Sequence, residues 1–268
     1  MKVVNLNVSR NLFLSVLVLM QVSCAHISNQ ANIDSRISWH SIKKAAHESS
    51  TSKHTWIPLI DAAVFSIDDW DEKAVGWVSD SNPLFGNIKG GQRTSDQLSD
   101  LSKLNLLLAL TMASAQADES LSEGFSRLTL TALAIDANAR ITNSIKSSRN
   151  RLRPDGSDNL SFPSGHSSGA SSKSAIARYH IRQIDNLTTQ QREFWQISNT
   201  TIAMLTGWAR IEGEKHYPSD VFAGYALGNF VGSFFSQAFI KPLLDSNAHV
   251  ALSVIPDEQI IIQVQFRW

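Results

Sequence analysis

Apolar side chains recur every three or four positions over much of the chain between residues 56 and 240, which is the period of a helix with one buried face. The two longest runs begin after Ser95 or Asp96, either of which can cap a helix, and at about Leu121. Shorter helices are expected over about 57–67, 194–208 and 218–240. Two more are expected to begin at about 68 and 166. Pro83 and the glycines between 86 and 91 predict a loop. The pattern therefore predicts an all-α domain over residues 56–240.

The last segment of the chain, residues 241–268, has a different pattern. Apolar residues cover 250–255, a Pro-Asp-Glu turn follows, and alternation then runs from Ile260 to Trp268. This is typical of two strands joined by a tight turn. We expect a small C-terminal β-hairpin, whose role the sequence does not indicate.

The N-terminus resembles an export signal. Lys2 and Arg10 precede an apolar run, 12–20, that is too short to span a bilayer. Ser23-Cys24 then resembles the end of a bacterial lipoprotein signal, although Gln21 is unusual there. We expect residues 1–23 to be a signal peptide and Cys24 to be the lipidated mature N-terminus. Ordinary secretion with an incidental cysteine is the alternative.

Residues 24–55 are polar, without a sustained apolar period, and are expected to be a tether. Four histidines lie there with spacings of 14, 7 and 7, so no two share a helical turn and no metal site is expected: His26, His40, His47 and His54.

Composition narrows the class of protein. A chain of 268 residues has room for one large domain. Its 24 basic and 24 acidic residues cancel, so nothing indicates a nucleic-acid partner. The mean hydropathy of −0.12 argues against a protein with many membrane spans. Because Cys24 is the single cysteine, an intramolecular disulfide is excluded.

Charged residues cluster at two places, 68–72 and 140–153. The acidic cluster at 68–72 is interpreted as a capped, solvated helix start rather than a cation site. Dipole compensation at a helix end can explain Arg149 and Arg151. It does not explain why five basic residues lie within fourteen positions ahead of a Ser/Gly-rich turn: Arg140, Lys146, Arg149, Arg151 and Arg153.

Three short patterns between residues 146 and 220 indicate a phosphate site. They are Lys146 with Arg153-Pro154, the tetrapeptide Pro163-Ser164-Gly165-His166, and Arg210 with His216 and Asp220. Lys146, Arg153 and Arg210 supply cations. The Ser164 hydroxyl and the Gly165 N–H, at an expected helix start, can complete a cradle for a phosphoryl group.

The two histidines of these patterns suit phosphoryl transfer. Asp220 lies one helical turn beyond His216, so its carboxylate can hold one imidazole nitrogen and leave the other free to attack phosphorus. His166, on the opposite side, can protonate the departing oxygen. A single histidine in a protein core more often has a structural role. His166 and His216, however, each lie among candidate phosphate ligands.

The segments KSSRNRLRP, FPSGH and RIEGEKHYPSD, the last running on into VFAGYALG, resemble the superfamily of type 2 phosphatidic acid phosphatases, bacterial class A acid phosphatases and vanadium haloperoxidases. The resemblance implies a helical bundle, a covalent phosphohistidine on His216, His166 as acid and base, and no catalytic metal or other cofactor. Ala209 replaces a serine that is frequent before the last arginine. HYPSD with its following Ala-Gly is closer to the lipid-phosphatase branch, although the six membrane spans of that branch are missing.

These observations predict an exported, metal-independent phosphatase of a bacterial periplasm or cell envelope. Its expected substrate is a membrane-derived phosphomonoester, such as phosphatidic acid or a polyprenyl phosphate, reached at a membrane surface through the lipid on Cys24. The 7 Trp and 12 Phe residues add to this expectation, because some of them can line a groove. A non-specific acid phosphatase acting on soluble phosphoesters is the main alternative, and a vanadate-dependent haloperoxidase is another. A non-enzymatic envelope protein would require a broken catalytic position, and none is broken. The oligomeric state is left open.

Overall fold

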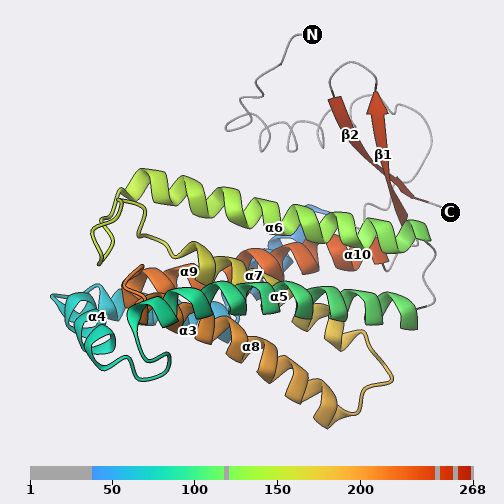
Figure 1. The fold of residues 1–268 in the computed structure, drawn as a ribbon. Coiled ribbons are helices and arrows are strands. Elements are labelled where there is room, and N and C mark those ends of the chain that lie inside the picture. The colour runs from blue at the N-terminus through green and yellow to red at the C-terminus, as the bar shows by residue number, and fades with distance from the viewer. Residues whose placement is uncertain (1–37, 118–120, 245–247, 256–258, 267–268) are drawn as a thin grey trace, which may run out of the picture. The chain divides into compact units, whose positions relative to one another are not determined.

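The computed structural model describes residues 38–117, 121–244, 248–255 and 259–266, and these residues form a bundle of helices followed by a hairpin (Figure 1). The predicted signal peptide and Cys24 lie outside the described residues. The elements in chain order are α2 (Trp39–Ser50), α3 (Lys53–Phe65), α4 (Trp70–Ser81), α5 (Ile88–Gln116), α6 (Leu121–Arg149), α7 (Gly165–Arg182), α8 (Thr189–Glu212), α9 (Pro218–Phe235), the π-helical turn η1 (Ser236–Ile240), α10 (Lys241–Leu244), β1 (Ala248–Ile255) and β2 (Gln259–Phe266). The predicted all-α bundle is confirmed. The hairpin is also present, with β1 antiparallel to β2 and Ala248 opposite Phe266.

Helix α7 is the centre of the bundle and packs against α5, α6, α8 and, most extensively, α9. Its contact with α9 depends on small residues, because a β-carbon added at Gly228 would lie 2.0 Å from a carbonyl oxygen. Three glycines, one per turn of α9, face backbone atoms of α7 and its cap in register: Gly224 against Ser164, Gly228 against Ser168 and Gly232 against Ser172. The backbones of α7 and α9 can therefore approach closely only because these positions of α9 are glycines.

The expected tether is partly helical. Ser38 caps α2 through a reciprocal capping box with Ser41, and α2 packs on α9 with Ala45 and Ser49 buried. Because the two fully buried side chains of α2 are small, the segment shows no sustained apolar period, and the sequence pattern missed it. The helical domain thus begins before residue 56.

Two helices begin earlier than predicted. Asn87 accepts a hydrogen bond from the Gly90 N–H at 2.8 Å, so α5 starts at Ile88 and includes glycines that we expected in a loop. Gly91 is needed for packing, since a β-carbon there would lie 2.9 Å from the Gly213 nitrogen at the end of α8. The Thr188 capping box starts α8 at Thr189 rather than at 194.

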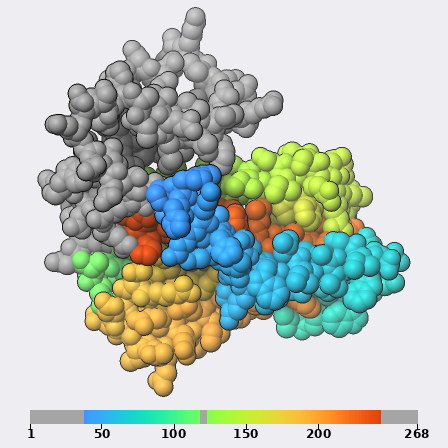
Figure 2. Space-filling view, turned by 180° about the vertical axis from the view of Figure 1, so that it is seen from behind, coloured from blue at the N-terminus to red at the C-terminus, as the bar shows by residue number. Residues whose placement is uncertain are grey.

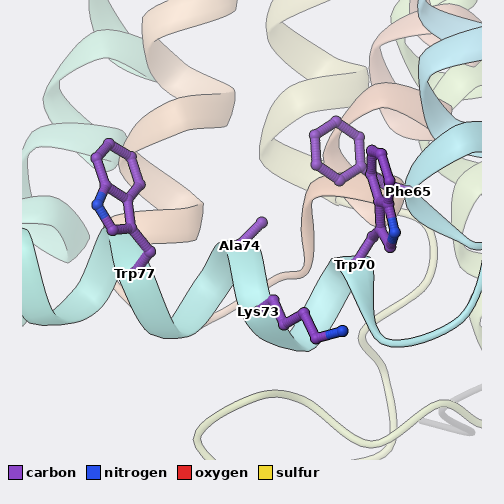
Figure 3. A pocket seen from close by; sticks show the side chains of 5 residues that line it. All are labelled: Phe65, Trp70, Lys73, Ala74 and Trp77. Carbon is purple, nitrogen blue, oxygen red and sulfur yellow. The ribbon is translucent and has the colours of Figure 1, made fainter.

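Large apolar side chains are exposed along α3 and α4, which lie on the face shown in Figure 2. We call this set the α3–α4 apolar surface: Trp56, Ile57, Leu59, Ile60, Val64, Ile67, Trp70 and Trp77. Trp70 and Trp77 project from the same side of α4 and, with Phe65, line a pocket of about 310 Å³ (Figure 3). Among the described residues, no helix combines the length and apolarity required to cross a membrane.

Candidate active site

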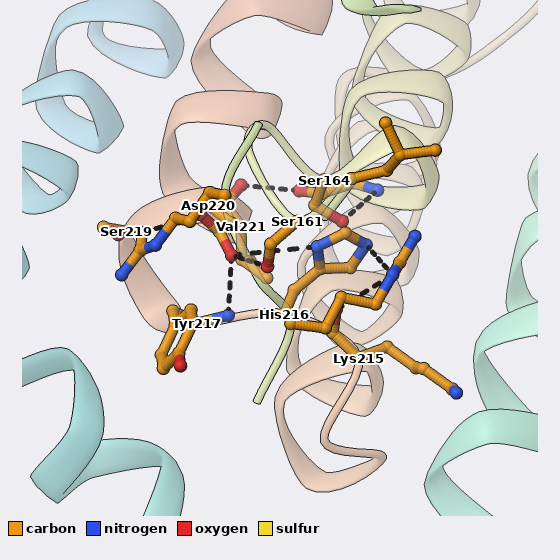
Figure 4. Close-up of polar contacts among 12 residues, drawn as sticks. Ser161, Ser164, Lys215, His216, Tyr217, Ser219, Asp220 and Val221 are labelled. Carbon is orange, nitrogen blue, oxygen red and sulfur yellow. Dashed lines mark hydrogen bonds and ion pairs between the residues drawn. The ribbon is translucent and has the colours of Figure 1, made fainter. Parts of the chain in front are cut away.

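The three sequence patterns meet at one end of the bundle. Lys146 lies in the last turn of α6, and the 150–164 loop follows. The residues just before α7 and at the start of α9 meet there, with Ser161 and Ser164 beside Asp220 and Val221 (Figure 4). Arg210 lies near the end of α8, and a short loop joins it to His216. The close approach of α9 to α7 brings the Ser164 N–H within 2.9 Å of the Asp220 carbonyl oxygen. The packing of small residues therefore determines where the site's two helix starts lie.

His216 is buried, with 1% of its surface exposed. Its Nε2 lies 3.2 Å from Nη1 of Arg153, and its Nδ1 lies 3.8 Å from Oδ2 of Asp220. These partners assign the proton to Nδ1 and a lone pair to Nε2. Burial lowers the pKa of His216 to about 3, the Asp220 carboxylate opposes this, and Lys146 and Arg210 add to the lowering. The imidazole is therefore neutral near pH 7.

The hydrogen bonds of Asp220 are made with residues other than His216. Its Oδ2 accepts from the Tyr217 N–H at 2.9 Å and from the Ser161 hydroxyl at 2.5 Å, and its Oδ1 accepts from Arg151 at 2.8 Å. Burial raises the pKa of Asp220, but His216, the Arg151 charge and the Ser161 hydroxyl together lower it more, so the net shift is downward. Asp220 thus faces His216 at ion-pair distance, which is too long for the hydrogen bond that the sequence suggested.

Arg151 is a site residue that sequence reasoning assigned to helix-dipole compensation. Its guanidinium joins Asp220 to Asp71, whose Oδ2 accepts at 2.8 Å, and it also donates to the Ser219 hydroxyl. It lies over the Tyr217 ring, 4.1 Å from the centroid. Asp71 is 2% exposed, so the interpretation of the acidic cluster as a solvated helix start is wrong at this residue.

A signal for Asp71 was present in the sequence. It precedes the buried Val75 and Val78 by four and seven residues, which places it on the inner face of α4. Asp69, the N-cap of that helix, makes no side-chain capping bond. Within the acidic cluster, Asp71 thus points into the protein, while the carboxylates of Asp68, Asp69 and Glu72 are exposed.

Three cations surround His216. The Lys146 ammonium donates to the Leu160 carbonyl at 2.6 Å, and Arg153 donates to the Lys215 carbonyl at 2.9 Å. Arg210 is buried, and its Nε makes no hydrogen bond within the described part of the chain. Burial, with repulsion from Arg153, lowers the pKa of Lys146 to about 8 and that of Arg210 to about 10. Cations held this close to one another form a site that an anion would stabilise.

The start of α7 completes the cradle. The Ser164 hydroxyl accepts from the Ser167 N–H at 3.4 Å, which leaves the first-turn N–H groups of Gly165 and His166 without partners inside the helix. A β-carbon at Gly165 would lie 3.6 Å from Cε of Lys146, so this lysine extends across the helix start. Free N–H groups, a positive dipole end and an ammonium converge here.

His166 pairs with Asp96, which the sequence suggested only as a possible cap of a long helix. Its Nε2 lies 2.9 Å from Oδ1 of Asp96 on α5. Burial lowers the pKa of His166 and Arg210 adds to this, while Asp96 opposes both, so the net shift is downward. A histidine in this environment can exchange a proton near neutral pH. All the residues predicted for phosphate binding and catalysis therefore lie in one region, together with Arg151, Asp71 and Asp96.

Comparisons with known proteins agree with this arrangement. The family model described as "PAP2 superfamily" matches residues 127–242. A lipid A 1-phosphatase of Porphyromonas gingivalis is 34% identical over 92 residues, which cover 34% of this chain and 19% of that protein; the chain thus spans about a fifth of that relative's length. A transmembrane PAP2-type phosphatidylglycerolphosphate phosphatase from Bacillus subtilis has a similar fold, with a TM-score of 0.52 and 21% identity over 69% of this chain and 92% of that one. The family resemblance predicted from the motifs is confirmed.

Proposed function

We propose that this chain, whose residues 127–242 match the family model described as "PAP2 superfamily", is a phosphatase that hydrolyses phosphomonoesters without a catalytic metal. One observation carries the proposal: the Nε2 of a buried, neutral His216 lies among three cations and a helix start. Phosphoryl transfer needs positive charge around the equatorial oxygens and an in-line nucleophile. Both are available from side chains and backbone groups of this chain.

The geometry supports a two-step mechanism. Nε2 of His216 attacks phosphorus, the bond to the ester oxygen breaks, and His166 protonates that oxygen. His216 becomes positively charged as the phosphohistidine forms, and the Asp220 carboxylate 3.8 Å from Nδ1 stabilises this charge. Water activated by His166 then attacks the phosphohistidine and releases phosphate. Lys146, Arg153 and Arg210 stabilise the phosphoryl oxygens in both steps.

The first experiment tests this chemistry. His216→Ala should lower kcat on p-nitrophenyl phosphate at least 1,000-fold, or about 4 kcal/mol, while the exposed His40→Ala should retain activity. EDTA should not inhibit, and enzyme quenched under denaturing alkaline conditions should carry labelled phosphate on His216. Loss of activity with EDTA and recovery with magnesium would refute the metal-independent mechanism, and label on a serine would refute the assignment of the nucleophile.

For the substrate we propose a membrane-derived phosphomonoester, such as phosphatidic acid or a polyprenyl phosphate. The names of the two similar proteins refer to lipid phosphates. The α3–α4 apolar surface supports the proposal further, because Trp side chains beside aliphatic ones suit the boundary between lipid and water. An exported protein held at the envelope membrane by a lipid on Cys24 would meet such substrates.

A substrate panel tests this choice. We expect a higher kcat/KM on dispersed phosphatidic acid or polyprenyl phosphate than on p-nitrophenyl phosphate or nucleotides. A clear advantage for the soluble esters would instead favour the periplasmic acid phosphatase. Halide oxidation after loading with vanadate would indicate the haloperoxidase alternative.

A further inference from the structure

Lys173, in the middle of α7, is a buried cation that the proposed mechanism does not use. Only 6% of its surface is exposed, and in the described part of the chain its ammonium forms no hydrogen bond or ion pair. Asp100 on the neighbouring α5 is engaged by Lys103, whose ammonium lies 2.7 Å from its Oδ1. Burial, with repulsion from Lys103, lowers the pKa of Lys173 to about 8. The ammonium is not fully enclosed, so it stays open to an anion from solution.

The direction of the Lys173 side chain connects it to the candidate active site. His166, Gly169 and Lys173 are spaced by three and four residues, so they lie on one face of α7. The Lys173 Nζ lies 3.3 Å from the point where a β-carbon of Gly169 would be. The side chain therefore runs back along the helix toward His166 and ends about one turn from it. Gly169 leaves room for the ammonium at this level.

We infer that Lys173 forms a second anion subsite, which binds a phosphate or carboxylate carried by the departing alcohol. The inference rests on the proposed function, because His166 marks the leaving-group side only if it protonates that alcohol. From the start of α7 to Gly169 the helix rises roughly 6 Å. A second acidic group joined to the scissile phosphate by a spacer of about four carbons would span this distance. The preferred substrate would thus carry two acidic groups.

The experiment compares butyl phosphate with butane-1,4-diol bisphosphate at constant ionic strength. In the wild-type protein we expect kcat/KM to be at least tenfold higher for the bisphosphate, well beyond the twofold statistical advantage of its two ester groups. Lys173→Met should reduce this ratio to about two, and Lys173→Arg should restore most of it. Lys44→Met, which removes an exposed lysine from α2, should leave the ratio unchanged.

The outcomes separate this inference from the proposed function. A wild-type ratio near two, with clear hydrolysis of butyl phosphate, would overturn the subsite and leave the phosphatase standing. A Lys173→Met variant that loses activity equally on both esters would show a structural role and would also overturn it. Should that variant fail to fold, Lys173→Gln and Lys173→Arg give the same ratio test. Absence of hydrolysis of every phosphomonoester by the wild-type protein would overturn both proposals.

Discussion

At the scale of single residues, burial and charge act together on His216. Burial keeps the imidazole neutral, because a charged ring would lose its hydration, and Lys146 and Arg210 act in the same direction. The same cations can bind the phosphoryl group that His216 would attack. In the phosphoenzyme the transferred group would partly neutralise them, and the cation formed at His216 would face Asp220. One set of side chains would thus serve both the free enzyme and the proposed phosphoenzyme.

Lys146 predicts how activity depends on pH. Its pKa is lowered from 10.5 to about 8, mainly by burial, so it is charged below pH 8 and neutral above. Because kcat/KM reports the free enzyme, we expect a first fall as His166, the proposed acid, loses its proton at a pKa below its usual 6.5, and a further fall as the pH rises through about 8. Lys146→Arg should remove the limb near pH 8 and keep the limb of His166, even at a lower overall rate, because a guanidinium stays charged. An unchanged limb in that variant would assign the transition to another group.

Arg151 predicts a large effect on stability. It joins the buried carboxylates of Asp71 and Asp220, and Arg151→Met would leave both without their cation. We expect the free energy of unfolding to fall by about 3–5 kcal/mol in urea titrations. Arg149→Met removes an exposed neighbour whose guanidinium lies 5.5 Å from the Phe162 centroid, and it should cost less than about 1 kcal/mol. Equal losses in the two variants would contradict the bridging role.

At the scale of elements, the contact between α7 and α9 positions the site. Ser167 and Ser171 donate to the carbonyl oxygens of Val221 and Tyr225, each at 2.7 Å, so hydrogen bonds accompany the glycine packing. These bonds hold the helix that starts beside His216 against the helix that starts at Gly165. The relative position of the nucleophile and the phosphate cradle therefore depends on the spacing between two backbones.

Gly228→Ala should disrupt this spacing. The new β-carbon would lie 2.0 Å from the Ser168 carbonyl oxygen, and backbone atoms cannot move aside as a flexible side chain can. We expect a loss of about 3 kcal/mol of unfolding free energy and a lower kcat. The control is Gly76→Ala in α4, where nothing lies within 4 Å of the added carbon; it should stabilise the protein by about 0.5–1 kcal/mol. Similar results for the two variants would show that this contact tolerates expansion.

At the scale of the whole molecule, α4 connects the site to the apolar surface. Its inner face carries Asp71, which binds Arg151, and its outer face carries Trp70 and Trp77. If the α3–α4 apolar surface contacts a membrane, the candidate active site lies one helix away from the lipid. A substrate with its phosphate at the membrane surface would need to move only a short distance.

Vesicle flotation tests this arrangement. In a Cys24→Ala background, which removes any lipid anchor, the protein should still bind phospholipid vesicles. The double variant Trp56→Glu and Ile60→Glu on α3 should bind at least tenfold more weakly, or about 1.4 kcal/mol. Phe194→Glu replaces a residue of α8 that is 73% exposed, and it should not change binding. An equal loss with Phe194→Glu would indicate nonspecific hydrophobic adsorption instead of a defined membrane-facing surface.

The sequence alone was sufficient for features that depend on neighbouring residues. The helical periods and the serine that caps α7 are local, because a helix brings residues three or four apart to one face. The pairing of His216 with Asp220 was predicted only in part, because His216 precedes the N-cap of α9 and its Nδ1 lies 3.8 Å from the carboxylate. The order of the three motifs then indicated a phosphate site and the family. The short hairpin was also predictable, since alternation and a tight turn are local signals.

The tertiary structure was required for partners that lie far apart in the chain. Asp71 is 80 residues from Arg151, and Asp96 is 70 residues from His166. Nothing near Lys173 in the sequence indicated that it is buried without a partner. Burial and ion pairing are set by the packing of helices that the chain separates widely. For this reason the motifs predicted which residues form the site, and the fold decided which charges neutralise one another and which remain for a ligand.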